Sequence, residues 1–237
     1  MRIDKLLANV GYGSRKEVKK LLKTGGIKLN GEVVKDAKMH VNPEEDAVIV
    51  NGEEVIYKEF VYFMMNKPPG VVSATEDSRD ETVVDILAME DAARSPFPVG
   101  RLDKDTEGLL ILTNDGHLSH QLLSPKKHVP KTYFAVIDQE VTEEDVKAFA
   151  DGVTLDDGYH TKPGILKILK SGITSDIELT ITEGKFHQVK RMFESVGKRV
   201  MYLKRISMGP LPLDEELELG DYRELTDEEV EMLKSNE

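Results

Sequence analysis

Cysteine and tryptophan are both absent from this chain of 237 residues. The lack of cysteine excludes disulfide bonds, thiol nucleophiles and Cys-ligated zinc. A chain that needs no disulfides suits a reducing compartment, so we expect a cytoplasmic protein. The lack of tryptophan leaves tyrosine, phenylalanine, histidine and arginine as the side chains that can stack on a flat ligand.

Long hydrophobic runs are also missing. No stretch approaches the roughly 20 apolar residues of a membrane helix. Charged residues interrupt the N-terminus before a signal peptide could form, at Arg2, Asp4 and Lys5. None of the glycine-rich motifs that cradle nucleotide phosphates is present. We therefore expect a protein that neither enters a membrane nor uses a nucleotide cofactor.

The net charge of −12 argues against a polyanionic partner at first, but the charges are unevenly distributed. Residues 1–40 hold ten Lys or Arg against four Asp or Glu, and residues 185–205 hold seven against one. Residues 214–237 hold eleven acidic residues against two basic ones. Because local fields steer polyanions, the two basic segments are compatible with a nucleic-acid partner, although solvated helix faces have the same composition.

The N-terminal segment has the pattern of two helices followed by a hairpin. Apolar residues recur at helical spacing in residues 3–11, and Ser14 with Glu17 forms a capping box for a second helix. The pair Asn30-Gly31 between two short alternating runs is a strong hairpin signal. We expect a small module that ends near residue 58.

This module resembles the S4 RNA-binding domain in three segments: residues 2–7, the helix start at 14–16 and the run 27–31. The resemblance implies that the second helix and the hairpin bind structured RNA through backbone charge and shape. The residues that we expect to contact phosphates are Arg15, Lys16, Lys19 and Lys20.

Residues from 59 onward alternate short apolar runs with a few helical patterns. Strands are indicated at 61–65, 132–137 and 177–182, and a Pro-Pro-Gly turn follows the first of them. Capping boxes at Thr142 and Thr226 begin two helices, and apolar residues between 189 and 196 form the buried side of another. The best class is α+β with an extensive, mainly antiparallel sheet.

The segment 100–116 carries the densest set of charged residues before an apolar strand. Asp103 stands between Arg101 and Lys104, so these residues alone fit either a catalytic carboxylate or a surface ion pair. The run Asn114-Asp115-Gly116 has the composition of a turn.

Three motifs in this part of the chain resemble those of the pseudouridine synthases, specifically the RsuA-type group. They are the segment 100–116, the triplet Lys131-Thr132-Tyr133 and the segment 183–193. The resemblance implies that Asp103 is the essential catalytic residue and that Tyr133 packs on the target base. It also implies that the basic residue at Lys190 pairs with Asp103, with Arg191 as a second candidate.

The resemblance further implies the overall organisation: an S4-like domain at 1–58 and a pseudouridine synthase domain at 59–237, on a mainly antiparallel mixed sheet. Uridine isomerisation gains and loses no atoms, so we expect no cofactor and no metal. A carboxylate can act there as a nucleophile or as a base. The expected partner is ribosomal RNA, bound by a monomer. Further expected RNA contacts are Arg101, Lys185 and Arg191.

Several other interpretations of the same residues remain. His117, His120 and His128 suggest a metal site, but the spacing is a weak signal. Asp103 and Asp105 resemble a glycosidase carboxylate pair. A noncatalytic RNA-binding assembly factor would keep the fold without the activity. Within the family, the segment 185–191 resembles the small-subunit type more than the large-subunit type, and both remain open.

Overall fold

The computed structural model describes residues 1–43 and 45–235. The chain forms two compact units, one made of residues 1–61 and 87–96 and the other of residues 62–86 and 97–237. Residues 87–96 therefore belong with the N-terminal unit, although the sequence analysis assigned them to the second domain, 59–237. None of the helices in the described ranges is long and apolar enough to span a membrane.

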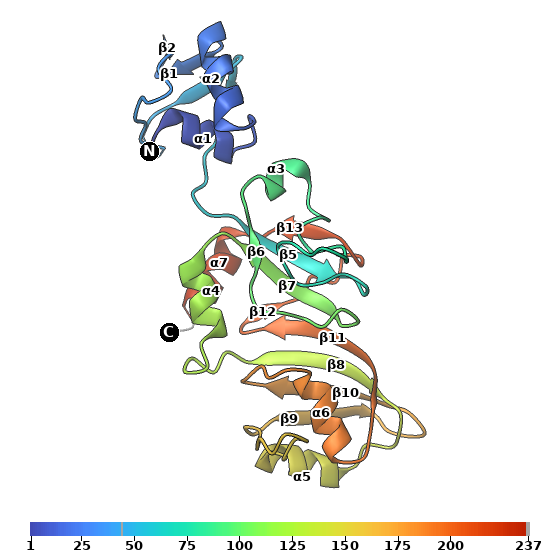
Figure 1. Ribbon diagram of the computed structural model, residues 1–237. Helices are drawn as coiled ribbons and strands as arrows, with labels where there is room; N and C mark the ends of the chain where they lie inside the picture. Colours follow the sequence, from blue (N-terminus) through green and yellow to red (C-terminus); the bar gives the residue numbers. More distant parts are fainter. Residues whose placement is uncertain (44, 236–237) are drawn as a thin grey trace. The chain divides into compact units, whose positions relative to one another are not determined.

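Within the described residues, the N-terminal unit contains three helices and a four-stranded antiparallel sheet in the order β2-β1-β3-β4. Figure 1 labels its helices and the strands β1 and β2. The helices are α1 (Ile3–Asn9), α2 (Arg15–Thr24) and α3 (Met89–Ala92). The strands are β1 (Ile27–Leu29), β2 (Glu32–Val33), β3 (Val48–Val50) and β4 (Glu53–Glu54).

Local sequence signals account for this unit. The Ser14 hydroxyl accepts a hydrogen bond from the Glu17 amide and the Glu17 carboxylate accepts one from the Ser14 amide, so the predicted capping box is confirmed. Gly25 ends α2 in the left-handed conformation, with φ of 80°. Asn30 and Gly31 connect β1 to β2, as predicted. The buried core is formed by Ile3, Leu6, Leu7, Val18, Leu22, Ile27, Val34, Val41, Val48 and Val50.

The second unit is built on one mixed sheet whose main path runs β13-β5-β7-β11-β8-β10-β9, with β6 beside β7 and β12 beside β11. All its pairings are antiparallel except that of β7 with β11. The strands are β5 (Tyr62–Lys67), β6 (Phe97–Pro98), β7 (Glu107–Thr113), β8 (Lys131–Ile137), β9 (Ile165–Lys170), β10 (Ser175–Ile181), β11 (Val200–Met208), β12 (Leu211–Pro212) and β13 (Tyr222–Glu224). The predicted α+β class and mainly antiparallel sheet are confirmed.

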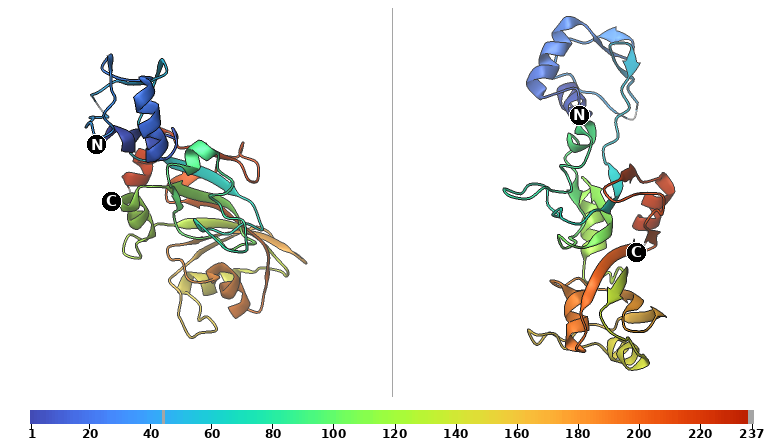
Figure 2. Two further views of the ribbon diagram at one scale, coloured as in Figure 1. Left: turned by 45° about the horizontal axis from the view of Figure 1, so that its top comes forward. Right: turned by 90° about the vertical axis from the view of Figure 1, so that its right-hand side faces the viewer.

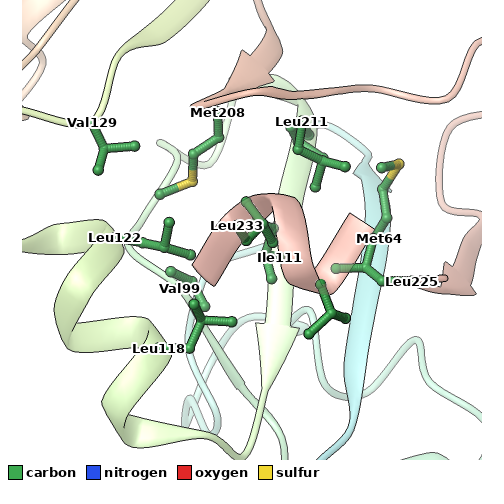
Figure 3. Packing of buried hydrophobic residues seen from close by; sticks show 12 residues of the cluster. Met64, Val99, Ile111, Leu118, Leu122, Val129, Met208, Leu211, Leu225 and Leu233 are labelled. Carbon is green, nitrogen blue, oxygen red and sulfur yellow. The ribbon is translucent and has the colours of Figure 1, made fainter. Parts of the chain in front are cut away.

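Four helices accompany this sheet: α4 (Gly116–Leu123), α5 (Glu143–Asp151), α6 (Gln188–Ser195) and α7 (Asp227–Lys234). Helices α5 and α6 lie next to each other (Figure 2), with the rings of Phe149 and Phe193 in edge contact at 4.9 Å. Leucines of α4 and α7 converge on Ile111 of β7 in a second apolar cluster (Figure 3).

The single parallel pairing of the sheet depends on a glycine. Gly108 on β7 has φ of 100° and lies against Arg205 of β11. A Cβ atom at Gly108 would overlap the carbonyl oxygen of Arg205, so no other residue allows this close approach. Gly108 directly follows the segment 100–107. The close approach of β7 to β11 therefore also fixes where that segment joins the sheet.

One predicted turn proved to be a helix start. Asp115 is the N-cap of α4, and its carboxylate accepts hydrogen bonds from the amides of His117 and Leu118. The interpretation of Asn114-Asp115-Gly116 as a simple turn therefore missed a helix. An Asp before an apolar stretch is itself an N-cap signal, which the turn-like composition concealed.

Candidate active site

Residues from all three sequence motifs line one pocket of the second unit. Asp103 comes from the loop between β6 and β7, Tyr133 from β8, and His187 and Gln188 from the start of α6. The pocket has a volume of about 90 Å³. The full lining is Arg101, Leu102, Asp103, Thr106, Tyr133, Ile181, Gly184, Lys185, His187, Gln188, Val189 and Leu203. The fold thus brings together side chains that are about 80 residues apart in the chain.

A lysine joins the two carboxylates of the loop. The Lys190 Nζ atom lies 3.1 Å from Asp103 Oδ2 and 2.7 Å from Asp105 Oδ1. Burial alone would lower the pKa of Lys190, but the hydrogen bonds to Asp105 and Asp103 outweigh it and raise this pKa. The same hydrogen bond lowers the pKa of the Asp105 carboxyl. The site therefore holds a cation beside Asp103 at neutral pH.

The backbone of the Asp103 loop is fixed by two residues that the sequence analysis did not select. The Ser73 hydroxyl donates to the Leu102 carbonyl and accepts from the Leu102 amide, both at 3.1 Å. The Lys67 ammonium donates to the carbonyls of Lys104 at 3.4 Å and Thr106 at 3.0 Å. These contacts hold the residues on both sides of Asp103 in place.

Lys67 is fully buried at the end of β5, where its ammonium also donates to the Pro68 carbonyl. Burial lowers the pKa of Lys67 to about 8, although the carboxylates of Asp105, Asp103 and Glu107 act in the opposite direction. A lysine at the end of an apolar strand, just before Pro-Pro-Gly, is the signal that would have identified it.

Tyr133 forms part of the pocket wall and is 9% exposed. It alternates along β8 with partly exposed Thr132 and Phe134, so its ring lies on the face of the sheet that holds the pocket. Thr106 also lines the pocket, and its hydroxyl is a buried group that has no hydrogen-bond partner among the described residues. The pocket therefore combines a flat aromatic ring and a carboxylate.

The third motif forms a tightly bonded turn before α6. The Glu183 carboxylate accepts hydrogen bonds from the Tyr159 hydroxyl, the Lys162 amide and the Gln188 side-chain amide. The Gln188 side-chain oxygen accepts one from the Lys185 amide. The turn is therefore fixed at both ends, which sets the start of α6 and with it the position of Lys190.

The three other expected contacts near the pocket differ in their surroundings. Arg101 and Lys185 line the pocket, and the Lys185 Nζ atom lies 4.3 Å from the centre of the Tyr159 ring. Arg191 forms ion pairs with Asp156 and Asp157 instead, and these raise the pKa of its guanidinium. Of the two residues considered as the partner of Asp103, the structure places Lys190 there and Arg191 elsewhere.

The comparisons with known proteins agree with this geometry. The family model for RNA pseudouridylate synthase matches residues 61–195, and that for the S4 domain matches residues 1–48. The chain belongs to the RNA pseudouridylate synthase family. In this chain the S4 domain match precedes the RNA pseudouridylate synthase match.

Curated relatives of this pseudouridine synthase match it over nearly their full length. An RNA pseudouridine synthase of Bacillus subtilis (strain 168), named as uncharacterized, is 57% identical over 98% of both chains. The ribosomal small subunit pseudouridine synthase A of Escherichia coli (strain K12) is 38% identical over 97% of this chain and 98% of its own. The ribosomal large subunit pseudouridine synthase B of Bacillus subtilis is 40% identical over 99% and 96%.

A solved structure gives the same fold. The crystal structure of a pseudouridylate synthase superimposes with a TM-score of 0.69 at 38% identity and covers 98% of this chain and 99% of its own. Because the match covers 98% of this chain, it includes both the N-terminal unit and the second unit.

The expected phosphate contacts of the S4 domain lie on α2. Lys16, Lys19 and Lys20 are exposed there. Arg15 also has a partner within the protein. Its guanidinium and that of Arg2 both bind the fully buried carboxylate of Asp4. Burial would raise the pKa of Asp4, but the hydrogen bonds from Arg15 and Arg2 outweigh it and lower this pKa. Arg15 thus anchors α2 to α1 in addition to any RNA contact.

The histidines suggested as metal ligands do not form a site. Among the described residues, no group of three or more His, Cys, Asp or Glu side chains is placed to hold a metal ion. His117 and His120 lie on α4, and His128 faces Lys162, at 2.9 Å between His128 Nδ1 and Lys162 Nζ. The metal interpretation therefore has no structural support in this part of the chain.

Proposed function

We propose that this pseudouridine synthase isomerises a uridine of small-subunit ribosomal RNA, and that Asp103 is its catalytic carboxylate. The observation that carries the proposal is the contact of Asp103 with Lys190, 3.1 Å apart, in the same pocket as the Tyr133 ring. The pocket therefore offers an anionic group, its counter-ion and a flat surface for a base. We also expect the enzyme to act as a cytoplasmic monomer.

The chemistry requires these three groups and no cofactor. The bond between uracil N1 and ribose C1′ breaks, the uracil turns, and a bond forms between its C5 and C1′. The proton leaves C5, and N1 ends protonated. The Asp103 carboxylate supports this either as a nucleophile at C1′ or as a base at C2′, and both roles require the ionised form.

Each neighbour of Asp103 then has a defined task. Lys190 stabilises the charge of the carboxylate when a bound base excludes water from the pocket. Tyr133 offers a ring on which the turned uracil stacks. Arg101 and Lys185 offer positive charge to the phosphates on either side of the uridine. A uridine must leave its helical stack to reach Asp103, which costs a few kcal/mol, and these phosphate contacts offset that cost.

The choice of ribosomal subunit rests on the third motif. The segment 185–191 reads Lys-Phe-His-Gln-Val-Lys-Arg, and its resemblance to the small-subunit type favours small-subunit RNA. The relative named small subunit pseudouridine synthase A is 38% identical, whereas the one named large subunit pseudouridine synthase B is 40% identical. Large-subunit RNA is therefore the second candidate.

Pseudouridine mapping of ribosomal RNA tests the proposal. A strain that lacks the gene is complemented with the wild type, with Asp103→Asn, or with the matched control Asp105→Asn. We expect one small-subunit pseudouridine to disappear on deletion and to return with the wild type and with Asp105→Asn, but not with Asp103→Asn. A lost site in the large subunit would show the second candidate to be correct, and an unchanged map would contradict both.

A further inference from the structure

An exposed aromatic pair lies at the edge of the pocket. Phe186 is 75% exposed, and the rest of the seven phenylalanines are far less so, with Phe60 next at 41%. The Phe186 ring stacks on the His187 ring, with centroids 3.7 Å apart and planes at 21°. An exposed aromatic ring beside a pocket offers a flat face on which another ring can stack.

The pair continues outward from the catalytic carboxylate. The His187 Nε2 atom lies 3.5 Å from Asp103 Oδ1, and His187 is part of the pocket lining whereas Phe186 is not. His187 is thus the inner ring and Phe186 the outer one. A nucleotide next to a uridine in the pocket would therefore reach the free face of Phe186.

The pair is held in a fixed orientation before any ligand binds. The hydrogen bonds of Glu183 and Gln188 close the turn that carries it. The Arg191 guanidinium donates to the Phe186 carbonyl at 3.3 Å. His187 has φ of 48° and ψ of 34°, a left-handed conformation that is uncommon outside glycine. A rigid aromatic surface loses little entropy on binding.

The charges around the pair select the partner. Arg101 and Lys185 line the pocket beside this turn, whereas Lys190 is paired with Asp103 and Asp105. Exposed rings flanked by cations are how proteins bind unpaired nucleic acid, because the bases stack and the phosphates meet positive charge.

We propose that Phe186, supported by His187, is a stacking surface for an unpaired RNA base adjacent to the target uridine. The inference rests on the proposed function and deepens it. Phe186 binds and positions the substrate, while Asp103 carries out the chemistry. Stacking on an aromatic ring contributes about 1–3 kcal/mol per base by alanine substitution, which corresponds to about 5–150-fold in the dissociation constant.

The test uses the full-length protein and a nine-nucleotide RNA that carries 2-aminopurine between two runs of four uridines. Stacking quenches 2-aminopurine fluorescence. Phe186→Ala should abolish the quenching and weaken binding by at least about fivefold, and Phe186→Tyr should retain both. Ile173→Ala, at a site 94% exposed on the turn between β9 and β10, is the matched control and should bind like the wild type.

Two outcomes overturn the stacking surface. One is a dissociation constant for Phe186→Ala within twofold of the wild type, which would leave a protein as the better partner for this surface. The other is the absence of quenching with the wild type. On ribosomal RNA transcripts, Phe186→Ala should raise KM by at least about fivefold and leave kcat nearly unchanged, because stacking that is equal in the bound and transition states affects only binding.

Failure of the proposed function gives a different result. If the enzyme does not modify ribosomal RNA, the pseudouridine map stays unchanged while quenching of the short RNA still depends on Phe186. If the stacking surface is wrong, the map changes on deletion while Phe186→Ala binds normally.

Discussion

Replacement of Lys190 by methionine tests the central contact of the site. Methionine has nearly the same length but no charge, so Asp103 loses a partner at 3.1 Å and Asp105 one at 2.7 Å. A hydrogen bond between charged groups contributes about 1.5–3 kcal/mol. Because Asp103 is 27% exposed and Lys190 21% exposed, water screens part of the interaction, and we take the lower end of that range. About 1.5 kcal/mol lost in the transition state lowers the rate about tenfold.

The assay follows from the reaction, because the C5 hydrogen of uridine leaves during isomerisation. RNA labelled with tritium at C5 therefore releases tritium to water at the rate of turnover. We expect Lys190→Met to release tritium about tenfold more slowly at saturating RNA, by the same bond estimate, and Lys190→Arg to recover most of the rate because the cation is retained.

Asp105→Asn is the matched control, since it removes the outer carboxylate and keeps the contact of Lys190 with Asp103. It should change the rate by less than about threefold, as expected for a 73% exposed group. A folded Lys190→Met enzyme that turns over within twofold of the wild type would refute the reasoning. In that case the charge of Asp103 would not depend on Lys190.

Three further changes test the scaffold. Gly108→Ala should lower the free energy of unfolding by about 2–4 kcal/mol in urea titration, because its Cβ overlaps the Arg205 carbonyl. The control is Gly158→Ala, where φ is 81° and the space around the glycine is open, and it should lose less stability. Equal losses in the two variants would contradict the overlap. Lys67→Met should remove the part of the pH dependence of folding stability that Lys67 causes. The pKa of Lys67 falls from 10.5 to about 8 on folding, so the unfolded chain binds more protons between these values and wild-type stability gains up to about 3 kcal/mol as pH rises. A constant difference in urea midpoint between wild type and Lys67→Met from pH 7.5 to 10 would argue against this burial. Asp4→Asn should destabilise the S4 domain by about 1–3 kcal/mol, since Arg2 and Arg15 lose their buried partner; unchanged melting of that domain would be the opposing result.

The sequence was most informative where a signal is local. The capping boxes at Ser14, Thr142 and Thr226 depend on residues three positions apart, and all three begin helices. The hairpin at Asn30-Gly31 likewise follows from two residues. The family resemblance added the long-range information that Asp103, Tyr133 and Lys190 share one site, and the structure brings them to one pocket or into contact there. Their catalytic roles stay predictions.

The parts that were missed depend on contacts between distant segments. The residues beside Lys67 mark it as unusual, but nothing near Lys67 or Ser73 in sequence shows that they bind the backbone around Asp103, 39 and 29 residues later respectively. The parallel pairing of β7 with β11 is also invisible to periodicity, because it joins strands almost 100 residues apart. The partners of Arg191 could not be predicted either, since Asp156 and Asp157 meet it only through the fold.

The pairing of β7 with β11 also bears on the order in which the chain can fold during its synthesis. In the described residues the two strands pair at two positions, Glu107 with Lys204 and Gly108 with Arg205. Until the ribosome has released residues 200–208, β7, which follows the Asp103 loop, has no neighbour linking it to β8 and Tyr133. A nascent chain can fold its N-terminal domain early, but it cannot assemble the pocket before this strand is made. We therefore expect RNA binding by the S4 domain to precede catalysis on a newly made chain.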